Sequence, residues 1–195
     1  HGREAVIEDV DLSRTIGWFT TITPVRLELG AVSTPGETLR SVKEQLRGVP
    51  NRGIGFGLLR YLNEDAELRA AMKATPAPEI AFNYMGQYGP EQFESSYWNR
   101  LRHLTGPNLS PRGHRPNLFE IDGSVSEGRL EVVWTYSENV HKRSTVEKLA
   151  QKYAEQLRLL IDHCTQPHAG GYTPSDFSKA RLSQRDLDKL ISKLQ

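Results

Sequence analysis

Residues 117–164 read NLFEIDGSVSEGRLEVVWTYSENVHKRSTVEKLAQKYAEQLRLLIDHC and carry the strongest local pattern in the chain. Apolar and polar side chains alternate over residues 117–125 and 129–137 on either side of a Ser-Glu-Gly turn, which predicts a β-hairpin. A capping-box pattern at residues 144–147 then opens a helix whose apolar residues recur at helical spacing as far as Cys164. Such an apolar stripe packs on a sheet or on another helix.

The sequence upstream adds further elements. Thr34-Pro35-Gly36-Glu37 predicts a helix start, with Thr34 as the cap and Glu37 reaching back to it, and Gly48 predicts its end. Two further strands are expected over residues 16–29 and over residues 79–85. Pro24 would lie at an edge or a bulge of the first strand, or would divide it into two pieces. Further helices are expected over residues 58–62 and 66–74 and from Ser183 onward. Strands and helices mix without strict alternation, which predicts an α/β or α+β fold with a mixed β-sheet covered by helices.

Composition excludes several classes of function. The chain has 195 residues, with 25 Lys+Arg against 24 Asp+Glu and a net charge of +1, so it lacks the basic field that a nucleic-acid partner needs. No apolar run approaches the roughly 20 residues of a membrane span. The six histidines show no zinc-ligand spacing, so no metal is expected. A single cysteine, Cys164, fits a reducing compartment and predicts a cytoplasmic location.

Several residues have both a structural and a functional interpretation. The segment PNRGIGFG at 50–57 is rich in glycine but lacks the full phosphate-loop and dinucleotide patterns, so tight backbone packing is the simpler interpretation. On the strand at 79–85, Tyr84 and Asn83 face opposite ways, so Tyr84 is either a core aromatic or a cleft residue. Trp18-Phe19 has the same two interpretations. The segment 99–117 holds arginines and histidines without an acid, which fits a solvated surface or an acidic partner.

Four segments, in order, resemble the marker motifs of epimerization domains from nonribosomal peptide synthetases. Residues 1–4 (HGRE) resemble the end of EGHGRE, and 14–24 (RTIGWFTTITP) resemble RTVGWFTxxYP, with Thr23 where Tyr is usual. Residues 50–57 resemble PxxGxGYG, and 82–87 (FNYMGQ) resemble FNYLGQ. This resemblance implies a fold like that of chloramphenicol acetyltransferase, with two lobes in a V and a tunnel between them.

The resemblance also implies how the chain is divided. Residues 1–171 would form the C-terminal lobe, and residues 172–195 would form a linker or docking helix. The partners would be the N-terminal lobe, a peptidyl carrier protein domain and a downstream synthetase at the C-terminal helix.

The family inverts the α-carbon of an aminoacyl or peptidyl thioester on the phosphopantetheine arm of a carrier protein, without a bound cofactor. Its acid/base groups are a His in HHxxxDG, a motif that this sequence lacks, and the first Glu of EGHGRE. The sequence begins two residues after that Glu, so we expect this fragment to be inactive alone. By resemblance, the catalytic set here is Tyr84, Asn83 and Arg3, with Asn83 and Tyr84 facing the reacting centre. Trp18, Phe19 and His1 would bind substrate.

Two alternatives remain open. One is a condensation domain, which shares the fold and forms the peptide bond. The other is a non-catalytic relative that only recruits a carrier protein or a partner enzyme.

Overall fold

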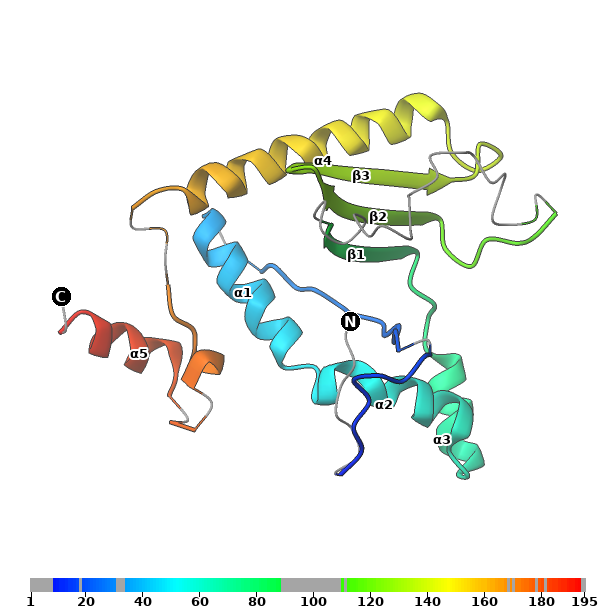
Figure 1. Ribbon diagram of the computed structural model, residues 1–195, viewed down its shortest axis with the longest axis horizontal. Coiled ribbons are helices and arrows are strands. Elements are labelled where there is room, and N and C mark those ends of the chain that lie inside the picture. The colour runs from blue at the N-terminus through cyan, green and yellow to red at the C-terminus, as the bar shows by residue number, and fades with distance from the viewer. Residues whose placement is uncertain are drawn as a thin grey trace. The chain divides into compact units, whose positions relative to one another are not determined.

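The computed structural model describes residues 9–17, 19–30, 34–88, 110, 112–167, 169, 171–177, 179–180 and 182–193. The chain divides into two compact units (Figure 1). Residues 77–155 form the sheet unit, and residues 1–76 together with 156–195 form the helical unit. No helix in the described part of the chain has the length and apolarity needed to cross a bilayer.

Within its described residues, the sheet unit contains three strands in the order β1-β2-β3 (Figure 1). β1 (Ile80–Tyr88) pairs in parallel with β2 (Phe119–Ser126), and β2 pairs antiparallel with β3 (Arg129–Tyr136). The turn between β2 and β3 has positive φ at Glu127 (53°) and Gly128 (73°), the backbone signature of a tight hairpin turn. The predicted hairpin and the predicted mixed sheet are therefore confirmed.

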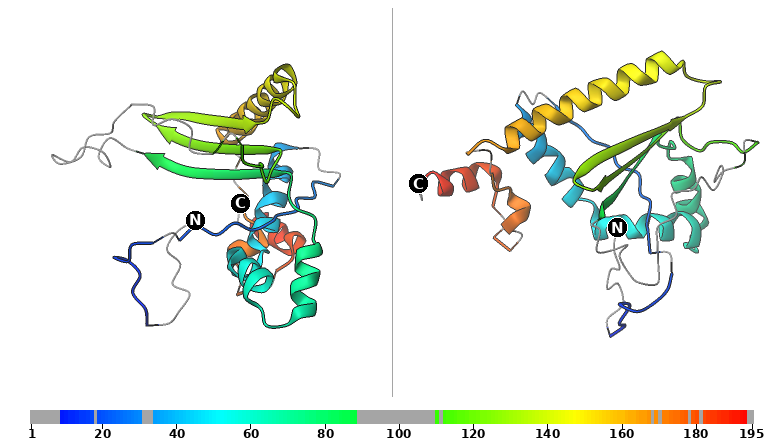
Figure 2. Two further views of the ribbon diagram at one scale, coloured as in Figure 1. Left: turned by 90° about the vertical axis from the view of Figure 1, so that its right-hand side faces the viewer. Right: turned by 45° about the horizontal axis from the view of Figure 1, so that its top comes forward.

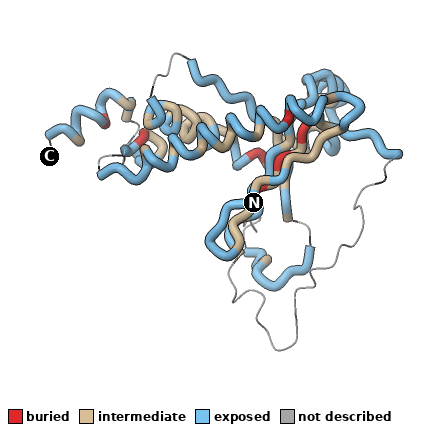
Figure 3. The backbone as a smooth tube through the Cα atoms, turned by 90° about the horizontal axis from the view of Figure 1, so that it is seen from above, coloured by how far each residue is buried: buried red, intermediate tan, exposed pale blue. Residues whose placement is uncertain are grey.

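Helix α4 (Arg143–Cys164) packs its first turns on the β2–β3 side of the sheet (Figures 1 and 2). Val146 of α4 is buried with Phe119 and Ile121, and the Trp134 ring packs edge-on against Phe119 at 6.0 Å and against Tyr153 of α4 at 5.8 Å. Figure 3 marks buried positions of the sheet in red. Aromatic edge contacts and aliphatic burial together supply the packing energy of this layer.

The start of α4 differs from the prediction. The sequence pattern makes Ser144 the cap, but the N–H groups of Thr145 and Val146 both bond to the carbonyl of Lys142, so the first turn closes earlier. Glu147, the expected capping partner, instead binds the Arg143 guanidinium at 2.8 Å. The predicted capping box at this helix is therefore wrong, although the helix itself is confirmed.

The helical unit begins with α1 (Pro35–Arg47), where the predicted Thr34–Glu37 capping box is present. The chain continues through η1 (Pro50–Gly53), α2 (Ile54–Gly57), η2 (Leu58–Leu62), which is a π-helical turn, and α3 (Ala66–Ala74). Near the C-terminus lie η4 (Pro174–Phe177) and α5 (Gln184–Ile191). The cap predicted at Ser183 is confirmed, because its side chain accepts from the N–H of Asp186.

The strand predicted over residues 16–29 is wrong for the described residues of that range, which have no regular secondary structure and join no sheet. The Gln45 side chain of α1 takes the place of a neighbouring strand: its Oε1 accepts from the N–H of Glu28, and its Nε2 donates to the carbonyl of Glu28, each at 2.8 Å. Pro24 also has no N–H to offer a ladder. A side-chain amide therefore satisfies backbone groups that a sheet would otherwise pair.

Candidate functional site

Asn83 and Tyr84 lie on β1, the strand formed by the FNYMGQ segment. In the register with β2, Asn83 is opposite Asp122 and Tyr84 is opposite Gly123. Because side chains alternate along a strand, Tyr84 shares the face of Ile121, on which α4 packs, and Asn83 lies on the other face. The predicted alternation is confirmed. It separates two side chains that the resemblance placed together at the reacting centre.

Asn83 has a partner on its own face of the sheet. Its Nδ2 donates to Oδ1 of Asp122 across the strand pair at 3.2 Å. The neighbouring carboxylate on the same face, Glu120, is instead neutralised by Arg115 at 3.2 Å. Within the described residues, no three His, Cys, Asp or Glu side chains gather as a metal site would require. The polar contact of Asn83 is therefore with the Asp122 carboxylate, which orients the Asn83 side-chain amide.

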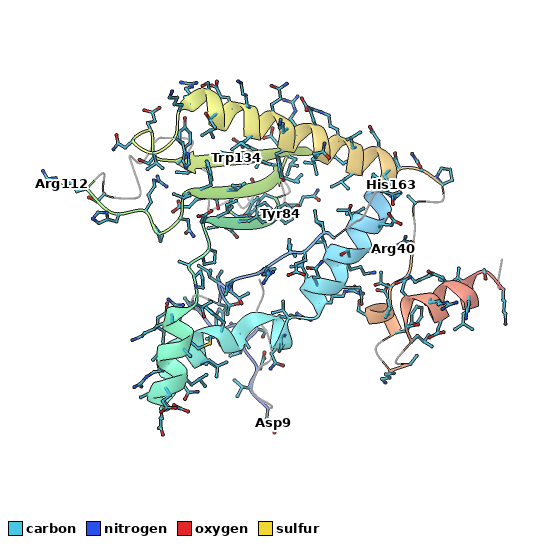
Figure 4. The ribbon with its side chains drawn as sticks, turned by 180° about the vertical axis from the view of Figure 1, so that it is seen from behind. Asp9, Arg40, Tyr84, Arg112, Trp134 and His163 are labelled. Carbon is cyan, nitrogen blue, oxygen red and sulfur yellow. The ribbon has the colours of Figure 1, made fainter. Side chains whose placement is uncertain are left out.

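Tyr84 is half-exposed, with 47% of its surface accessible, and its ring lies beside a glycine. Its Cδ2 is 3.4 Å from the place that a Cβ on residue 123 would occupy, an ordinary van der Waals separation, so the ring lies in contact range of Gly123. The register with β2 shifts between Tyr84 and Gln87, where Gly86 takes a φ of +88°. Such a bulge changes the direction in which nearby side chains point. Figure 4 shows Tyr84 on the sheet with Trp134 of β3.

The other predicted site residues lie near the N-terminus. Phe19 is partly buried in the helical unit, and its ring folds back over Gly17, with Cε2 3.1 Å from the place of a Cβ on that residue. His1, Arg3 and Trp18 lie outside the described residues. Their roles stay predictions.

Two of the motif segments meet at Thr23 and Gly53. Gly53 is buried with a φ of +84°, and a Cβ there would lie 2.4 Å from Cγ2 of Thr23. Asn51 and Arg52 also have positive φ, of 48° and 53°, so three consecutive residues are left-handed. Non-glycine residues adopt this conformation at a cost of about 1–2 kcal/mol each. The glycine-rich segment thus serves close backbone packing at Gly53, in agreement with the simpler interpretation of its sequence.

Comparison with known proteins identifies the family. The family model of the condensation domain matches residues 1–183. The chain belongs to the condensation-domain family. Its expected membership in the superfamily of nonribosomal peptide synthetase domains is thereby confirmed.

Curated relatives of this condensation-family chain are peptide synthases. It is 45% identical over 191 residues to a linear gramicidin synthase polypeptide from Brevibacillus parabrevis, covering 98% of this chain and 2% of the relative. It is 36% identical over 202 residues to gramicidin S synthase 1 of Brevibacillus brevis, covering 100% of this chain and 18% of the relative. The chain therefore spans a small part of the curated relatives it matches.

A solved structure confirms the fold. The crystal structure of the epimerization domain from the third module of tyrocidine synthetase B superposes with a TM-score of 0.70 at 34% identity. The match covers 84% of this chain and 36% of that one. The expected fold class, a mixed sheet with helices in the condensation-domain arrangement, is confirmed.

The condensation-family chain also contains a polar cluster that the sequence did not predict. Asp176 of η4 accepts from Nζ of Lys43 and from Nη1 of Arg47, both on α1 and both at 2.6 Å. Oδ2 of Asp176 also accepts from the N–H of Thr173, a residue with no exposed surface, at 2.9 Å. We name residues 173–176, with their contacts to α1, the exit clasp. The segment expected to leave the domain as a linker is thus bonded to the first helix.

Further contacts extend the exit clasp along α1. The hydroxyl of Ser175 donates to Oε1 of Glu44 and accepts from Nη1 of Arg47. Arg40, labelled in Figure 4, lies beside Gly171, with Nη1 3.2 Å from the place of a Cβ there. The Thr-x-x-Asp spacing at 173–176 signals a capped turn. Nothing in that spacing identifies α1 as the partner.

The contacts in the exit clasp lower the pKa values of two carboxyl groups. The hydrogen bond from Lys43, the N–H of Thr173 and the bond from Arg47 together hold the pKa of Asp176 far below its ordinary value of 3.8. Burial opposes ionisation of Glu44, but bonds from Ser175 and Thr173 outweigh it, and the pKa of Glu44 is lowered. Both groups are therefore carboxylates throughout the physiological range.

Proposed function

We propose that this chain is the C-terminal lobe of an epimerization domain in a nonribosomal peptide synthetase. The observation that carries the proposal is the match to an epimerization domain of known structure, at 34% identity over 84% of this chain. The reaction would invert the α-carbon of an aminoacyl or peptidyl group held as a thioester on the phosphopantetheine arm of a carrier protein. No resident cofactor takes part in it.

The chemistry explains why a hydroxyl on β1 is of interest. The α-proton of a thioester is a weak acid, so the enolate formed by its removal needs oriented hydrogen-bond donors. Tyr84 offers a phenolic O–H, and its ring is partly exposed and set beside Gly123. We assign Tyr84 the role of a donor to the enolate oxygen or of a proton relay. The acid/base pair itself would come from outside the described residues.

The remaining residues of the predicted site complete the proposal. Arg3 would hold the catalytic carboxylate or the oxygen of the substrate, and Trp18, Phe19 and His1 would contact the substrate in the tunnel. The partners would be the complementary N-terminal lobe, a peptidyl carrier protein and a downstream synthetase. We place the protein in the cytoplasm, where the exposed thiol of Cys164 stays reduced.

Deuterium uptake tests this function. The complete two-lobed domain would receive an aminoacyl thioester on its carrier in heavy water, and α-deuterium content and chirality would be followed with time. We expect exchange with inversion by the wild-type domain, slower exchange by Tyr84→Phe by about 10- to 100-fold, and none by this chain alone.

Peptide-bond formation is the second candidate function, because the family model that matches residues 1–183 is that of the condensation domain. A folded wild-type domain that exchanges no α-proton but joins two carrier-bound substrates would replace epimerization by peptide-bond formation. A domain that does neither but binds the carrier would indicate recruitment.

A further inference from the structure

We propose that Asp122 is a positioning residue of the epimerization site. By bonding to Asn83 it fixes β1 just before the strand leaves its register, and so holds the Tyr84 ring in place on the opposite face. The inference rests on the proposed function, in which Tyr84 contacts the reacting group. Asn83 thereby becomes part of the support for Tyr84 and not a second group at the reacting centre.

β1 is the strand that needs such support. It lies at an edge of the described sheet, and its pairing with β2 is regular from Ile80 to Tyr84 and then shifts before Gln87. Gly86 follows with a left-handed backbone at φ +88°. Within the described residues β1 has a neighbouring strand on one side only, so its register depends on its pairing with β2 alone. Tyr84 is the last residue before this irregular step.

Asp122, in contrast, stands on the best-anchored strand. β2 lies between β1 and β3, with Asp122 opposite Asn83 on one side and opposite Val133 on the other. Its chain neighbours Ile121 and Gly123 are buried. A carboxylate can only accept hydrogen bonds, so it draws the NH₂ group of the Asn83 amide toward β2. The bond therefore links the weakly held strand to the central one.

Two adjacent residues of β2 thus contact two adjacent residues of β1 from opposite faces. Asp122 holds Asn83 on the polar face, and the Tyr84 ring lies beside Gly123 on the face of α4. A slip of β1 by one residue would exchange the faces of Asn83 and Tyr84 and would break both contacts. The Asn83–Asp122 bond accordingly selects the register in which Tyr84 has its place.

The test uses the complete two-lobed domain and the α-deuterium assay, with kcat and KM measured for the loaded carrier. Asp122→Leu removes the acceptor, and we expect kcat to fall about 10-fold while KM changes by less than about 2-fold. Asp122→Asn keeps an acceptor oxygen and is expected to stay within about 2-fold of wild type. Asn83→Leu removes the same bond from the other strand and should match Asp122→Leu.

Two comparisons separate positioning from a general loss of structure. In a Tyr84→Phe background, Asp122→Leu is expected to cause no further loss, because the group it positions is already disabled. Glu120→Gln, a change on the same face of β2, is expected to leave kcat unaltered. An unchanged kcat in Asp122→Leu, or the same fold loss in both backgrounds, would overturn the inference.

Failure of the proposed function would give a different result in the same assay. A folded wild-type domain without α-proton exchange removes epimerization itself and this inference with it. Exchange by wild type that Tyr84→Phe leaves intact retains epimerization and removes only the positioning role of Asp122.

Discussion

Nζ of Lys43 lies 2.6 Å from Oδ2 of Asp176, although 133 residues separate the two in the sequence. Arg47, one turn farther along α1, holds the other oxygen of the same carboxylate at the same distance. One aspartate thus ties the C-terminal segment to helix α1. The ion pairs are only partly shielded, with 22% of the Asp176 side chain exposed, so geometry and the bonds to Thr173 matter alongside charge.

Asp176→Asn is expected to loosen the exit clasp. It removes the charge that pairs with Lys43 and Arg47 while leaving the size of the side chain unchanged. Hydrogen–deuterium exchange of residues 171–177 should become faster, and that of α4 should stay as it was. Asp162→Asn, which alters an exposed acid on α4, serves as the control. Unchanged protection of Thr173 in Asp176→Asn would contradict the assignment of Asp176 as the centre of the clasp.

The pH dependence of the clasp follows from the lowered pKa of Asp176. A carboxyl group whose folded pKa is depressed contributes stability that is complete above its unfolded value and is lost as the pH falls through the folded one. The ordinary value is 3.8 and the folded value lies well below it. Protection of the Thr173 amide, corrected for intrinsic exchange rates, is therefore expected to be equal at pH 7 and pH 5. A loss of protection between those two values would show that another group controls the clasp.

Gly53→Ala and Gly55→Ala form a matched pair. Gly53 combines a φ of +84° with a Cβ position 2.4 Å from Thr23, whereas a Cβ on Gly55 meets nothing within 4 Å. We expect Gly53→Ala to lower the free energy of unfolding by about 2–4 kcal/mol. Gly55→Ala, in helix α2, is expected to raise it by about 0.5–1 kcal/mol. Chemical denaturation checks both, and equal effects of the two changes would refute the packing role of Gly53.

Phe119 is the aromatic centre of the sheet unit. It contacts Trp134 edge-on and stacks on the ring of His141 at 4.6 Å. Phe119→Ala is expected to lower the free energy of unfolding by about 3 kcal/mol through lost burial and a residual cavity. Leu130→Ala, at a position 45% exposed on β3, should cost less than about 1 kcal/mol. Denaturation followed by tryptophan fluorescence measures both, and a smaller loss in Phe119→Ala than in Leu130→Ala would contradict this account of the core.

Local pattern predicted most of the individual elements. The Thr34 cap, the hairpin turn at Glu127-Gly128 and the helix α4 each depend on residues close in sequence, and each is confirmed. The predicted packing of the α4 stripe holds for Val146, whereas Leu149 and Ile161 of the same stripe are exposed. The strand expected over residues 16–29 is absent from the described residues of that range, and at Glu28 a side chain from another element, Gln45, takes the bonds that a neighbouring strand would have provided. Composition and alternation contain no information about such a substitute.

The candidate site was harder to predict for the same reason. Alternation correctly placed Asn83 and Tyr84 on opposite faces, but their partners Asp122 and Gly123 follow from a parallel register across 39 residues of sequence. The exit clasp depends on contacts of still longer range. Capping signals near Asp176 predict a turn, and only the folded chain brings α1 to it.

The contact of Thr23 with Gly53 has a consequence for exchanging segments between relatives. A chimera could take residues 14–24 from one synthetase and residues 50–57 from another. The side chain at position 23 and the backbone at position 53 would then come from proteins in which they were not selected to fit each other. In this chain the fit is between Thr and a glycine without a Cβ. A donor segment with a larger residue at position 23 would need a different backbone path at position 53. Crossover points are therefore better placed outside residues 14–57 than between the two segments.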